Sequence, residues 1–569
     1  MSFWSIDLGT SNTAVARWNP DAGHPDMIHF EELCREPEGG SEIDVRYSIP
    51  SSVFMVEPKT FKERMARWSV LDRWFSLGRR AYIGRAALER DRHTHGAHFV
   101  QCFKPALMRD SYRTLARMGG KSVAARSVAK LYLRELMREL KRLDGRRPKK
   151  VVVGTPVDCY EPYRAVLKQL LRELGVGTVK FVDEPVAAAL GYGLKLHDNR
   201  PFLVVDFGAG TLDLALIRMD RRTVEHSGTC RVLAKEGLQL GGNQVDAWLL
   251  EHFCRAKGFD LQRVSEMVEA WWARAMLSEA RSVKERLFFE EKTSFFLEPP
   301  EGMRSFDMIL KMQGDLVKEP LEVSREELIQ LMETQGVYRN VKEAMDSIAR
   351  QAERLGIFER DFGEVLMVGG SSLLPGIYRL AEDRYGRDRV RAWQPFFAVA
   401  YGGSVFADGS QVTTDFITHD YAVVTHDAKT REPQHHVVVP AGTVFPTAPD
   451  FWKKRLVPTC ATGEPEDLFR LVICELGRRH GDLQEFVWDG QGRLHRMDRE
   501  REQEGPVVIP LNENDPTFGT LNPPHMPSDR NARLEVSFGI NEDRWLVATV
   551  RDIKTDKMLM EQEAVVRLK

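Results

Sequence analysis

Two acidic residues, each at the start of a turn of small residues, carry the strongest chemical signal in the sequence. Asp7 and Asp206 each end an apolar strand pattern, and after the turn a second apolar strand returns. A triphosphate needs many hydrogen-bond donors at close range, and small residues let backbone N–H groups approach it. Two carboxylates beside a phosphate can also hold a hydrated magnesium ion, which prefers oxygen ligands. The two hairpins therefore predict one site for a Mg²⁺-bound nucleotide such as ATP or ADP.

The residues expected at the phosphates are the small and hydroxyl-bearing ones of the two turns: Gly9, Thr10, Ser11, Asn12, Gly208, Ala209, Gly210 and Thr211. The pattern differs from a P-loop, because GxxxxGK[ST] does not occur and neither turn requires a helix after it. For either hairpin alone, an aspartate that only accepts hydrogen bonds from its own turn is a common alternative. The occurrence of both hairpins in a duplicated context favours binding.

Two further residues are candidates for phosphoryl transfer to water, which mainly requires positioning and charge stabilisation. Glu184 could orient or deprotonate the attacking water. Lys104, in the apolar stretch 99–105, could stabilise the developing phosphate charge. From residue type alone, Glu184 could instead be a carboxylate favoured at a helix start. Lys104 could be a surface lysine with a packed aliphatic stem. Both alternatives stay open at this point.

The elements that would position these residues occur twice in the same order. An apolar run into a small-residue turn with a later proline occurs at 151–156 and again at 365–375. Each is followed by an Ala-rich, helix-like stretch, at 185–193 and 397–403. The repetition predicts two related α/β lobes, about 1–200 and 201–408, facing each other. Amphipathic helices are expected at 127–143, 163–174 and within 324–355.

The character of the chain changes near residue 409. Short β-rich runs, turn signals and prolines follow, with strand patterns at 437–445, 469–476, 533–540 and 545–550. Such spacing predicts a C-terminal β-sandwich over 417–569, after a linker at 409–416. The predicted fold class is thus α/β, with a two-lobed domain over 1–408 followed by the sandwich.

Composition excludes several other classes of protein. The 569 residues have a formal net charge of −2, which argues against a nucleic-acid partner. Seven cysteines are scattered without a CxxC, which disfavours a disulfide framework or zinc site and fits a reducing compartment. We find no signal-peptide pattern and no 18-residue apolar run, so we expect a cytoplasmic protein without a membrane partner.

Taken together, the motifs resemble the seventy-kilodalton heat-shock protein family, within the actin and sugar-kinase superfamily. Residues 7–13 and 204–216 are similar to its two phosphate loops. Residues 181–193 and 398–402 resemble its connecting segments, and 368–375 its adenosine loop. The segment 240–242, together with Asp246, resembles another signature of the family. The family's β-sandwich peptide-binding domain is similar to two later segments, 439–447 and 534–552. The resemblance implies an actin-like ATPase domain with a duplicated ribonuclease H-like fold.

The resemblance also implies roles for single residues. Asp7 and Asp206 would hold hydrated Mg²⁺, and Lys104 would be the catalytic lysine. Glu184, Asp206, Thr211 and Asp213 would act around the γ-phosphate and the attacking water. Pro156 and Arg164 match the family's proline switch and the arginine that reports nucleotide state. The further nucleotide contacts implied are Gly241, Gly242, Lys284, Gly369, Gly370, Ser371 and Leu373.

The sequence departs from the family pattern at four places. Leu373 stands where the family has an arginine that stacks on adenine, so cation–π stacking is lost. Arg281 and Phe288 replace a glutamate and a serine in the segment that keeps Lys284. Residues 412–417 replace the acidic, leucine-rich linker. The sequence given ends where the sandwich should end, without the α-helical lid, so we expect fast peptide release.

These observations predict a heat-shock-type chaperone with a slow, Mg²⁺-dependent ATPase. Its nucleotide state would control how the sandwich holds unfolded client polypeptide; a J-type co-chaperone and a nucleotide-exchange factor are implied by the family alone. The alternative is a nucleotide-gated scaffold that docks one dedicated partner with little or no turnover. A small-molecule kinase is disfavoured, because it would need no C-terminal sandwich. The basic segment 59–80, with Trp68 and Trp74, is either a partner-docking surface or a helix with a loop.

Overall fold

The computed structural model describes most of the chain as two compact units. The described residues are 3–36, 45–56, 80–94, 98–157, 159–193, 200–220, 228–256, 270–296, 320–392, 396–408, 411–414, 416–417, 419–427, 430, 432–460, 464–477, 485–488, 494–497, 507–513, 517–541 and 544–568. The first unit comprises Met1–Cys159, Tyr163–Val412 and Gly481–Glu500, and the second Tyr160–Pro162, Thr413–His480 and Arg501–Lys569. The segment considered as a docking surface, 59–80, lies outside the described residues except for its last position.

The first sheet of the first unit carries the hairpin of Asp7. Its strands, in spatial order, are β11 (Thr178–Asp183), β10 (Lys150–Thr155), β1 (Trp4–Leu8), β2 (Asn12–Asn19) and β3 (His24–Met27), with β4 (Ile49–Pro50) also beside β2. Strand β1 is antiparallel to β2 and parallel to β10, which is parallel to β11. Ile6 shares one buried core with Tyr132 of α4 (Ala125–Asp144) and Leu167 of α5 (Glu161–Glu173). Both helices lie where their apolar spacing predicts them.

The second sheet carries the hairpin of Asp206. Its spatial order is β18 (Val390–Ala392), β17 (Val365–Val368), β12 (Phe202–Phe207), β13 (Leu212–Asp220), β14 (Gly228–Leu238) and β19 (Gln411–Thr414). Strand β12 is antiparallel to β13 and parallel to β17, which is parallel to β18. The two sheets thus repeat one topology, a hairpin whose first strand runs parallel to two later strands. This is the repetition that the sequence motifs predict.

Helices cover the second sheet and complete its core. They are α7 (Gly242–Ala256), α9 (Ala270–Arg286), α11 (Arg325–Thr334), α12 (Val337–Glu353) and α13 (Ile377–Tyr385). Val205, Trp248 and Ile348 are buried together in this core. The helical stretch expected within 324–355 is two helices, α11 and α12, separated by a turn at 335–336. Helix α11 begins with a capping box in which Ser324 and Glu327 satisfy each other's backbone N–H groups.

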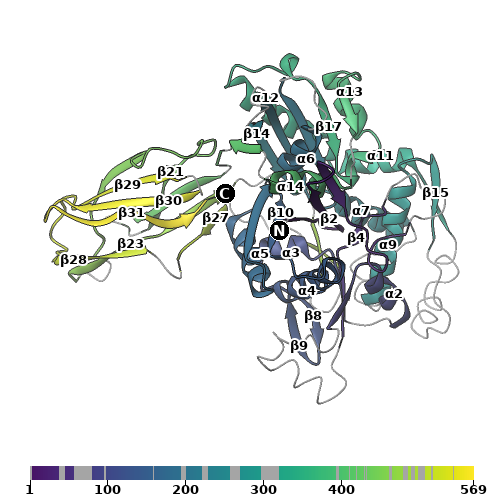
Figure 1. The fold of residues 1–569 in the computed structure, drawn as a ribbon, viewed down its shortest axis with the longest axis horizontal. Helices are drawn as coiled ribbons and strands as arrows, with labels where there is room; N and C mark the ends of the chain where they lie inside the picture. The colour runs from purple at the N-terminus through teal and green to yellow at the C-terminus, as the bar shows by residue number, and fades with distance from the viewer. Residues whose placement is uncertain are drawn as a thin grey trace. The chain divides into compact units, whose positions relative to one another are not determined.

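Two Ala-rich helices lie side by side in the middle of the first unit (Figure 1). They are α6 (Glu184–Gly193) and α14 (Ala398–Asp408), the segments expected to be helical from their composition. Their backbones touch at Gly402, where a Cβ would lie 1.6 Å from the carbonyl oxygen of Ala187. A side chain at this position would separate the helices, which explains why small residues recur along both segments.

The remaining elements of the first unit are shorter. They are β5 (Ser52–Met55), β6 (Ala81–Ile83), α2 (Arg85–Thr94), β7 (Phe99–Gln101), α3 (Lys104–Arg109), β8 (Thr114–Met118), β9 (Lys121–Ala124), β15 (Lys292–Phe295), β16 (Leu321–Ser324), η3 (Glu359–Asp361), η4 (Gly370–Leu373), β25 (Glu485–Trp488) and β26 (Leu494–Met497). Helix α3 begins at Lys104, with Pro105 in its first turn. Lys104 is therefore the first residue of α3, shortly after β7 ends.

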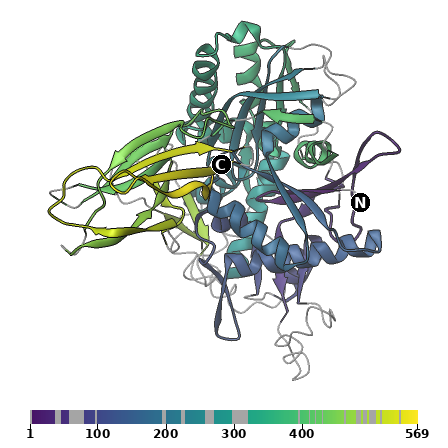
Figure 2. The ribbon, with the colours of Figure 1, turned by 60° about the vertical axis from the view of Figure 1, so that its left-hand side comes forward.

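The second unit is built from strands, coloured green to yellow in Figures 1 and 2. One sheet has the order β21 (Pro433–Val439), β20 (Asp420–His426), β24 (Ile473–Gly477) and β27 (Val507–Pro510). Another has the order β22 (Trp452–Leu456), β29 (Leu534–Ile540), β30 (Trp545–Asp552) and β31 (Lys557–Arg567). A two-stranded sheet pairs β23 (Glu466–Leu471) with β28 (Thr517–His525). Tyr421, Phe538 and Leu546 belong to one buried cluster that spans the two four-stranded sheets. Among the described residues, no helix has the length and apolar character needed to cross a membrane.

Candidate functional site

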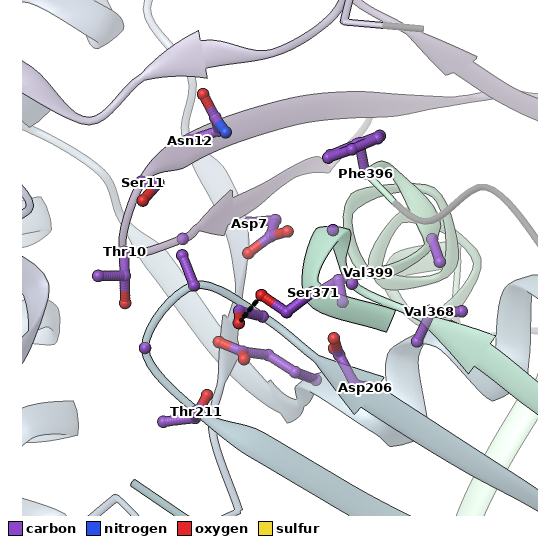
Figure 3. Close-up of a pocket in the computed structure, with 18 of the residues that line it drawn as sticks. Asp7, Thr10, Ser11, Asn12, Asp206, Thr211, Val368, Ser371, Phe396 and Val399 are labelled. Carbon is purple, nitrogen blue, oxygen red and sulfur yellow. Dashed lines mark hydrogen bonds between the residues drawn. The ribbon is translucent and has the colours of Figure 1, made fainter. Parts of the chain in front are cut away.

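One cavity in the first unit is lined by both lobes, and Asp7 and Asp206 both point into it (Figure 3). The predicted nucleotide site required this arrangement, because acids in separate environments could not share one ligand. Sixteen of the residues singled out in the sequence line the cavity, namely Asp7, Gly9, Thr10, Ser11, Asn12, Lys104, Glu184, Asp206, Gly208, Ala209, Gly210, Thr211, Lys284, Gly369, Gly370 and Ser371.

The two hairpins place their acids by the same register. Asp7 pairs with Ala14 across β1 and β2, and Asp206 pairs with Asp213 across β12 and β13, one residue before each strand ends. The turns that follow are held by small residues behind them. A Cβ on Gly241 would lie 2.3 Å from the carbonyl carbon of Ala209, so the second turn can reach its position only against a glycine. Backbone N–H groups in such turns are suited to binding anions.

The buried Glu184, Asp206 and Lys104, together with the half-buried Asp7, form the polar floor of the cavity. Lys104 Nζ donates to Glu184 Oε1 at 2.7 Å, and both side chains are almost completely buried. Burial raises the pKa of Asp7 to about 7, and the charge of Glu184 adds to this while Lys104 opposes it. Burial also raises the pKa of Asp206 well above its usual value, with further contributions from Glu184, Asp213 and Asp7. This cluster has more negative than positive charge, so a divalent cation fits it.

The alternatives left open for Lys104 and Glu184 can now be compared with the structure. Lys104 is 2% exposed, so the surface-lysine alternative is wrong. Burial alone would lower the pKa of Lys104, but the charges of Glu184, Tyr163 and Asp7 hold it above its usual value. Glu184 is the first residue of α6, as the helix-start alternative holds, and its carboxylate also faces the cavity. The helix start and the cavity position are therefore compatible.

A second buried polar group lies behind the cavity, around Pro156 and Arg164. Arg164 Nη2 donates to Thr155 Oγ1 at 3.0 Å and to Asp183 Oδ1 at 2.6 Å. Lys235 Nζ, from β14 of the other lobe, donates to Asp183 Oδ2 at 2.7 Å. The sequence reasoning did not identify the Asp183–Lys235 pair, although a lysine within the apolar run of β14 was a signal. Arg164 and Pro156 do not line the cavity.

Asp213 connects the second hairpin to the same region. Its Oδ1 accepts a hydrogen bond from the backbone N–H of Val157 at 2.6 Å, and its side chain is buried. Val157 directly follows Pro156. Asp213 does not line the cavity. It lies on β13 opposite Asp206 of β12, and its hydrogen bond joins this hairpin to the segment after Pro156.

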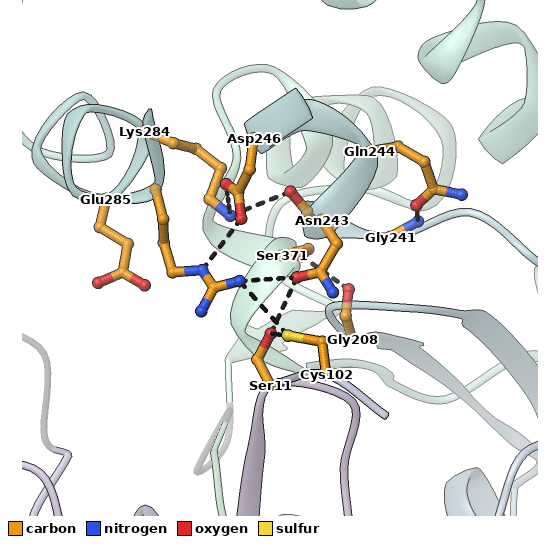
Figure 4. A network of polar contacts seen from close by, with 12 residues as sticks. Ser11, Cys102, Gly208, Gly241, Asn243, Gln244, Asp246, Lys284, Glu285 and Ser371 are labelled. Carbon is orange, nitrogen blue, oxygen red and sulfur yellow. Dashed lines mark hydrogen bonds and ion pairs between the residues drawn. The ribbon is translucent and has the colours of Figure 1, made fainter. Parts of the chain in front are cut away.

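Another part of the site is a polar network that joins the two lobes (Figure 4). Asp246 binds Arg281 at 3.0 Å and Lys284 at 2.6 Å. Asn243 Oδ1 accepts from Ser11 at 2.9 Å and from Arg281 at 3.2 Å. Arg281 of helix α9 thereby reaches the turn of residues 9–12 through Asn243.

Some predicted site residues lie beside the cavity and do not line it. Gly241 and Gly242 pack behind the second turn and against Ser371, and Leu373 ends η4 outside the lining. Lining residues that were not assigned a binding role from sequence are Arg281, Glu285, Phe288, Val368, Phe396, Ala398 and Val399. Within the described part of the chain, no group of three His, Cys, Asp or Glu side chains is arranged to ligate a metal directly.

Comparison with known proteins gives a consistent family. A sequence model described as Hsp70 protein matches residues 83–455. The chain is 25% identical to the stromal 70 kDa heat shock-related chloroplastic protein of Pisum sativum, over 81% of this chain and 60% of that protein. It is 26% identical to the chaperone protein DnaK of Deinococcus proteolyticus, over 71% of this chain and 58% of that protein. For the DnaK of Thermus thermophilus the identity is 24%, over 78% and 66%. The chain thus spans about 60% of the length of these relatives.

Proposed function

This chain belongs to the Hsp70 protein family, and from that premise we propose that it hydrolyses ATP slowly with Mg²⁺ to control how its C-terminal domain holds polypeptide. The observation that carries the proposal is the single cavity into which Asp7 and Asp206 point from two separate hairpins, beside the Lys104–Glu184 pair. ATP and ADP, with Mg²⁺, are the proposed ligands. The family supplies the general class, an actin-like ATPase fold in chaperones.

In the proposed reaction, the two hairpins bind the phosphates and the buried pair acts on the water. Backbone N–H groups of residues 9–12 and 208–211 donate to phosphate oxygens, and the hydroxyl of Thr211 contacts the γ-phosphate. Asp7 and Asp206 would hold a hydrated magnesium ion, which would neutralise phosphate charge. Glu184 accepts the proton of the attacking water, whose oxygen bonds to the γ-phosphorus while ADP leaves. Lys104 stabilises the charge that develops.

Coupling to the C-terminal domain is proposed to run through the buried group behind the cavity. Asp213 binds the N–H after Pro156, and Arg164 binds Asp183, which also binds Lys235 of β14. The edge neighbour of β14 is β19 (Gln411–Thr414), formed by residues of the predicted linker. This neighbour relation supports a signalling role for the linker, although its sequence differs from the family pattern.

The C-terminal unit is proposed to be a β-sandwich that binds unfolded or client polypeptide. Two four-stranded sheets that share one buried cluster support this interpretation. Such a domain would bind peptides through main-chain hydrogen bonds and apolar pockets. A J-type co-chaperone, a nucleotide-exchange factor and a cytoplasmic location are proposed from the family and from the scattered cysteines.

The proposal is tested with the full chain in two assays. Phosphate release from Mg²⁺–ATP is expected to be slow in the wild type and largely lost in Asp206→Asn. Binding to an array of short apolar peptides is expected to differ between ATP and ADP. ATP binding without phosphate release, together with capture of one folded partner and no peptide binding, would favour the nucleotide-gated scaffold and count against the chaperone.

A further inference from the structure

Part of the cavity lining is made of aromatic rings and aliphatic side chains. Phe288, Phe396, Val368 and Val399 all contribute to the lining. In Figure 3, Phe396, Val368 and Val399 lie on the side of the cavity away from Thr10 and Thr211. The Phe396 ring packs directly on the backbone of Gly370, since a Cβ on that residue would lie 2.6 Å from it. The ring offers a flat apolar contact surface beside this loop.

The charged groups beside these rings already have partners within the protein. Arg281 and Lys284 share the carboxylate of Asp246, and Lys284 Nζ also donates to the carbonyl of Gly242 at 3.1 Å. The carboxylate of Glu285, which is partly exposed, binds Arg35 at 3.1 Å. Desolvation tends to raise the pKa of Glu285, but the positive charge of Arg35 keeps it low. The charges of Arg281, Lys284 and Glu285 are therefore already neutralised by protein partners and are not held ready for a base edge.

We propose that this part of the cavity holds the nucleotide base by stacking on Phe288 and Phe396 and does not read the base edge. Purine nucleoside triphosphates with different edges, ATP and GTP, would therefore bind with similar affinity. The inference rests on the proposed function, in which the two hairpins hold the phosphates.

The physical basis is the difference between stacking and hydrogen-bond recognition. Every base has a π-face, so stacking on an aromatic side chain tolerates changes of the base. A site built to hydrogen-bond a ligand rejects one that lacks the group by about 10⁴–10⁵, whereas an apolar pocket discriminates by only about 10–200-fold. Because Arg281, Lys284 and Glu285 are already paired, we place this site with the apolar pockets, which discriminate weakly.

Calorimetric titration of the full chain with Mg²⁺ and three probes tests the inference. The probes are ATP, GTP and inorganic tripolyphosphate, which has no base. We expect the ATP and GTP dissociation constants to differ by less than about 200-fold, the limit for an apolar pocket. Replacing Phe288 by Ala, or by Leu, which keeps apolar volume but removes the ring, should weaken both nucleotides by about 5- to 150-fold. Tripolyphosphate binding should not change in either variant.

Phe289 provides the matched control. It is adjacent in sequence, 46% exposed and outside the cavity lining, so Phe289→Ala should leave all three affinities unchanged. ATP binding more than about 200-fold tighter than GTP, or a Phe288→Ala effect no larger than that of Phe289→Ala, would overturn the inference. So would tripolyphosphate binding as tight as ATP, which would leave the phosphate site intact. If none of the three probes binds, the proposed function itself fails.

Discussion

The part of the cavity that we propose to face the phosphates (the phosphate side) and the ring-lined part use their charges in opposite ways. On the phosphate side, Asp7, Glu184 and Asp206 are crowded together beside Lys104, and the pKa values of the two aspartates are raised. On the ring-lined side, Arg281 is paired with Asp246, and Glu285 with Arg35. A buried charge without a partner is costly, and pairing offsets part of that cost. The first part is therefore suited to a charged ligand, and the second is satisfied without one.

The largest effect is expected when the excess of negative charge on the phosphate side is increased. Lys104→Ala leaves the carboxylates without their ammonium partner, so phosphate release should fall by about 10²–10³. Stability should fall by about 3–5 kcal/mol, as when one member of a buried pair is removed. A malachite-green phosphate assay and thermal unfolding measure the two effects.

The control for this variant is Lys121→Ala, on the exposed part of β9. It should change neither quantity. Unchanged turnover in Lys104→Ala would remove Lys104 from the catalytic proposal, whatever the change in stability.

A second variant tests Asp183, a paired acid behind the cavity. Asp183→Asn leaves Arg164 and Lys235 buried without their shared carboxylate, and we expect a loss of about 3–5 kcal/mol in stability. Chemical denaturation followed by tryptophan fluorescence measures this loss. The double variant Asp183→Asn with Lys235→Met removes one of the two cations and should recover part of it. A double variant as unstable as the single one would mean that the two cations do not repel each other there.

The hairpins and their acids were predictable from sequence because their signals are local. A strand, an acid and a turn of small residues lie within about ten positions, and the pattern occurs twice around Asp7 and Asp206. The helices α4 and α5 were predictable for the same reason, since apolar spacing is a property of one segment. The common cavity of the two hairpins was inferred from the duplication and from the family resemblance.

The pairs that cross between lobes were not predictable from local pattern. Asp183 and Lys235 are 52 positions apart, and only the packing of β14 against the first lobe brings them together. The Phe396 ring likewise becomes part of the cavity because Gly370 leaves room for it. Such contacts depend on tertiary arrangement, so the sequence showed unusual residues, as at Arg281, but not their partners.

An acid on the phosphate side should behave unlike Asp183 when it is neutralised. Asp7→Asn removes one of the crowded negative charges, so the unliganded protein should become more stable by about 0.5–2 kcal/mol, the usual gain when a functional strain is relieved. Affinity for Mg²⁺–ATP should fall at the same time. Thermal unfolding with and without Mg²⁺–ATP measures both. A less stable unliganded variant would mean that the carboxylate of Asp7 is structural.

The smallest effect is expected from an ion pair on the ring-lined side. Arg35 and Glu285 are both about one-quarter exposed, so Arg35→Ala should cost less than about 1 kcal/mol in stability. Arg17→Ala, which removes a more exposed pair with Asp144, is the matched control and should cost no more. Thermal unfolding of the two variants gives the comparison. A loss above about 2 kcal/mol for Arg35→Ala alone would show that this part of the cavity depends on a single cross-lobe pair, because exposed pairs rarely contribute so much. The contrast between the part of the cavity with excess negative charge and the part with paired charges would then no longer hold.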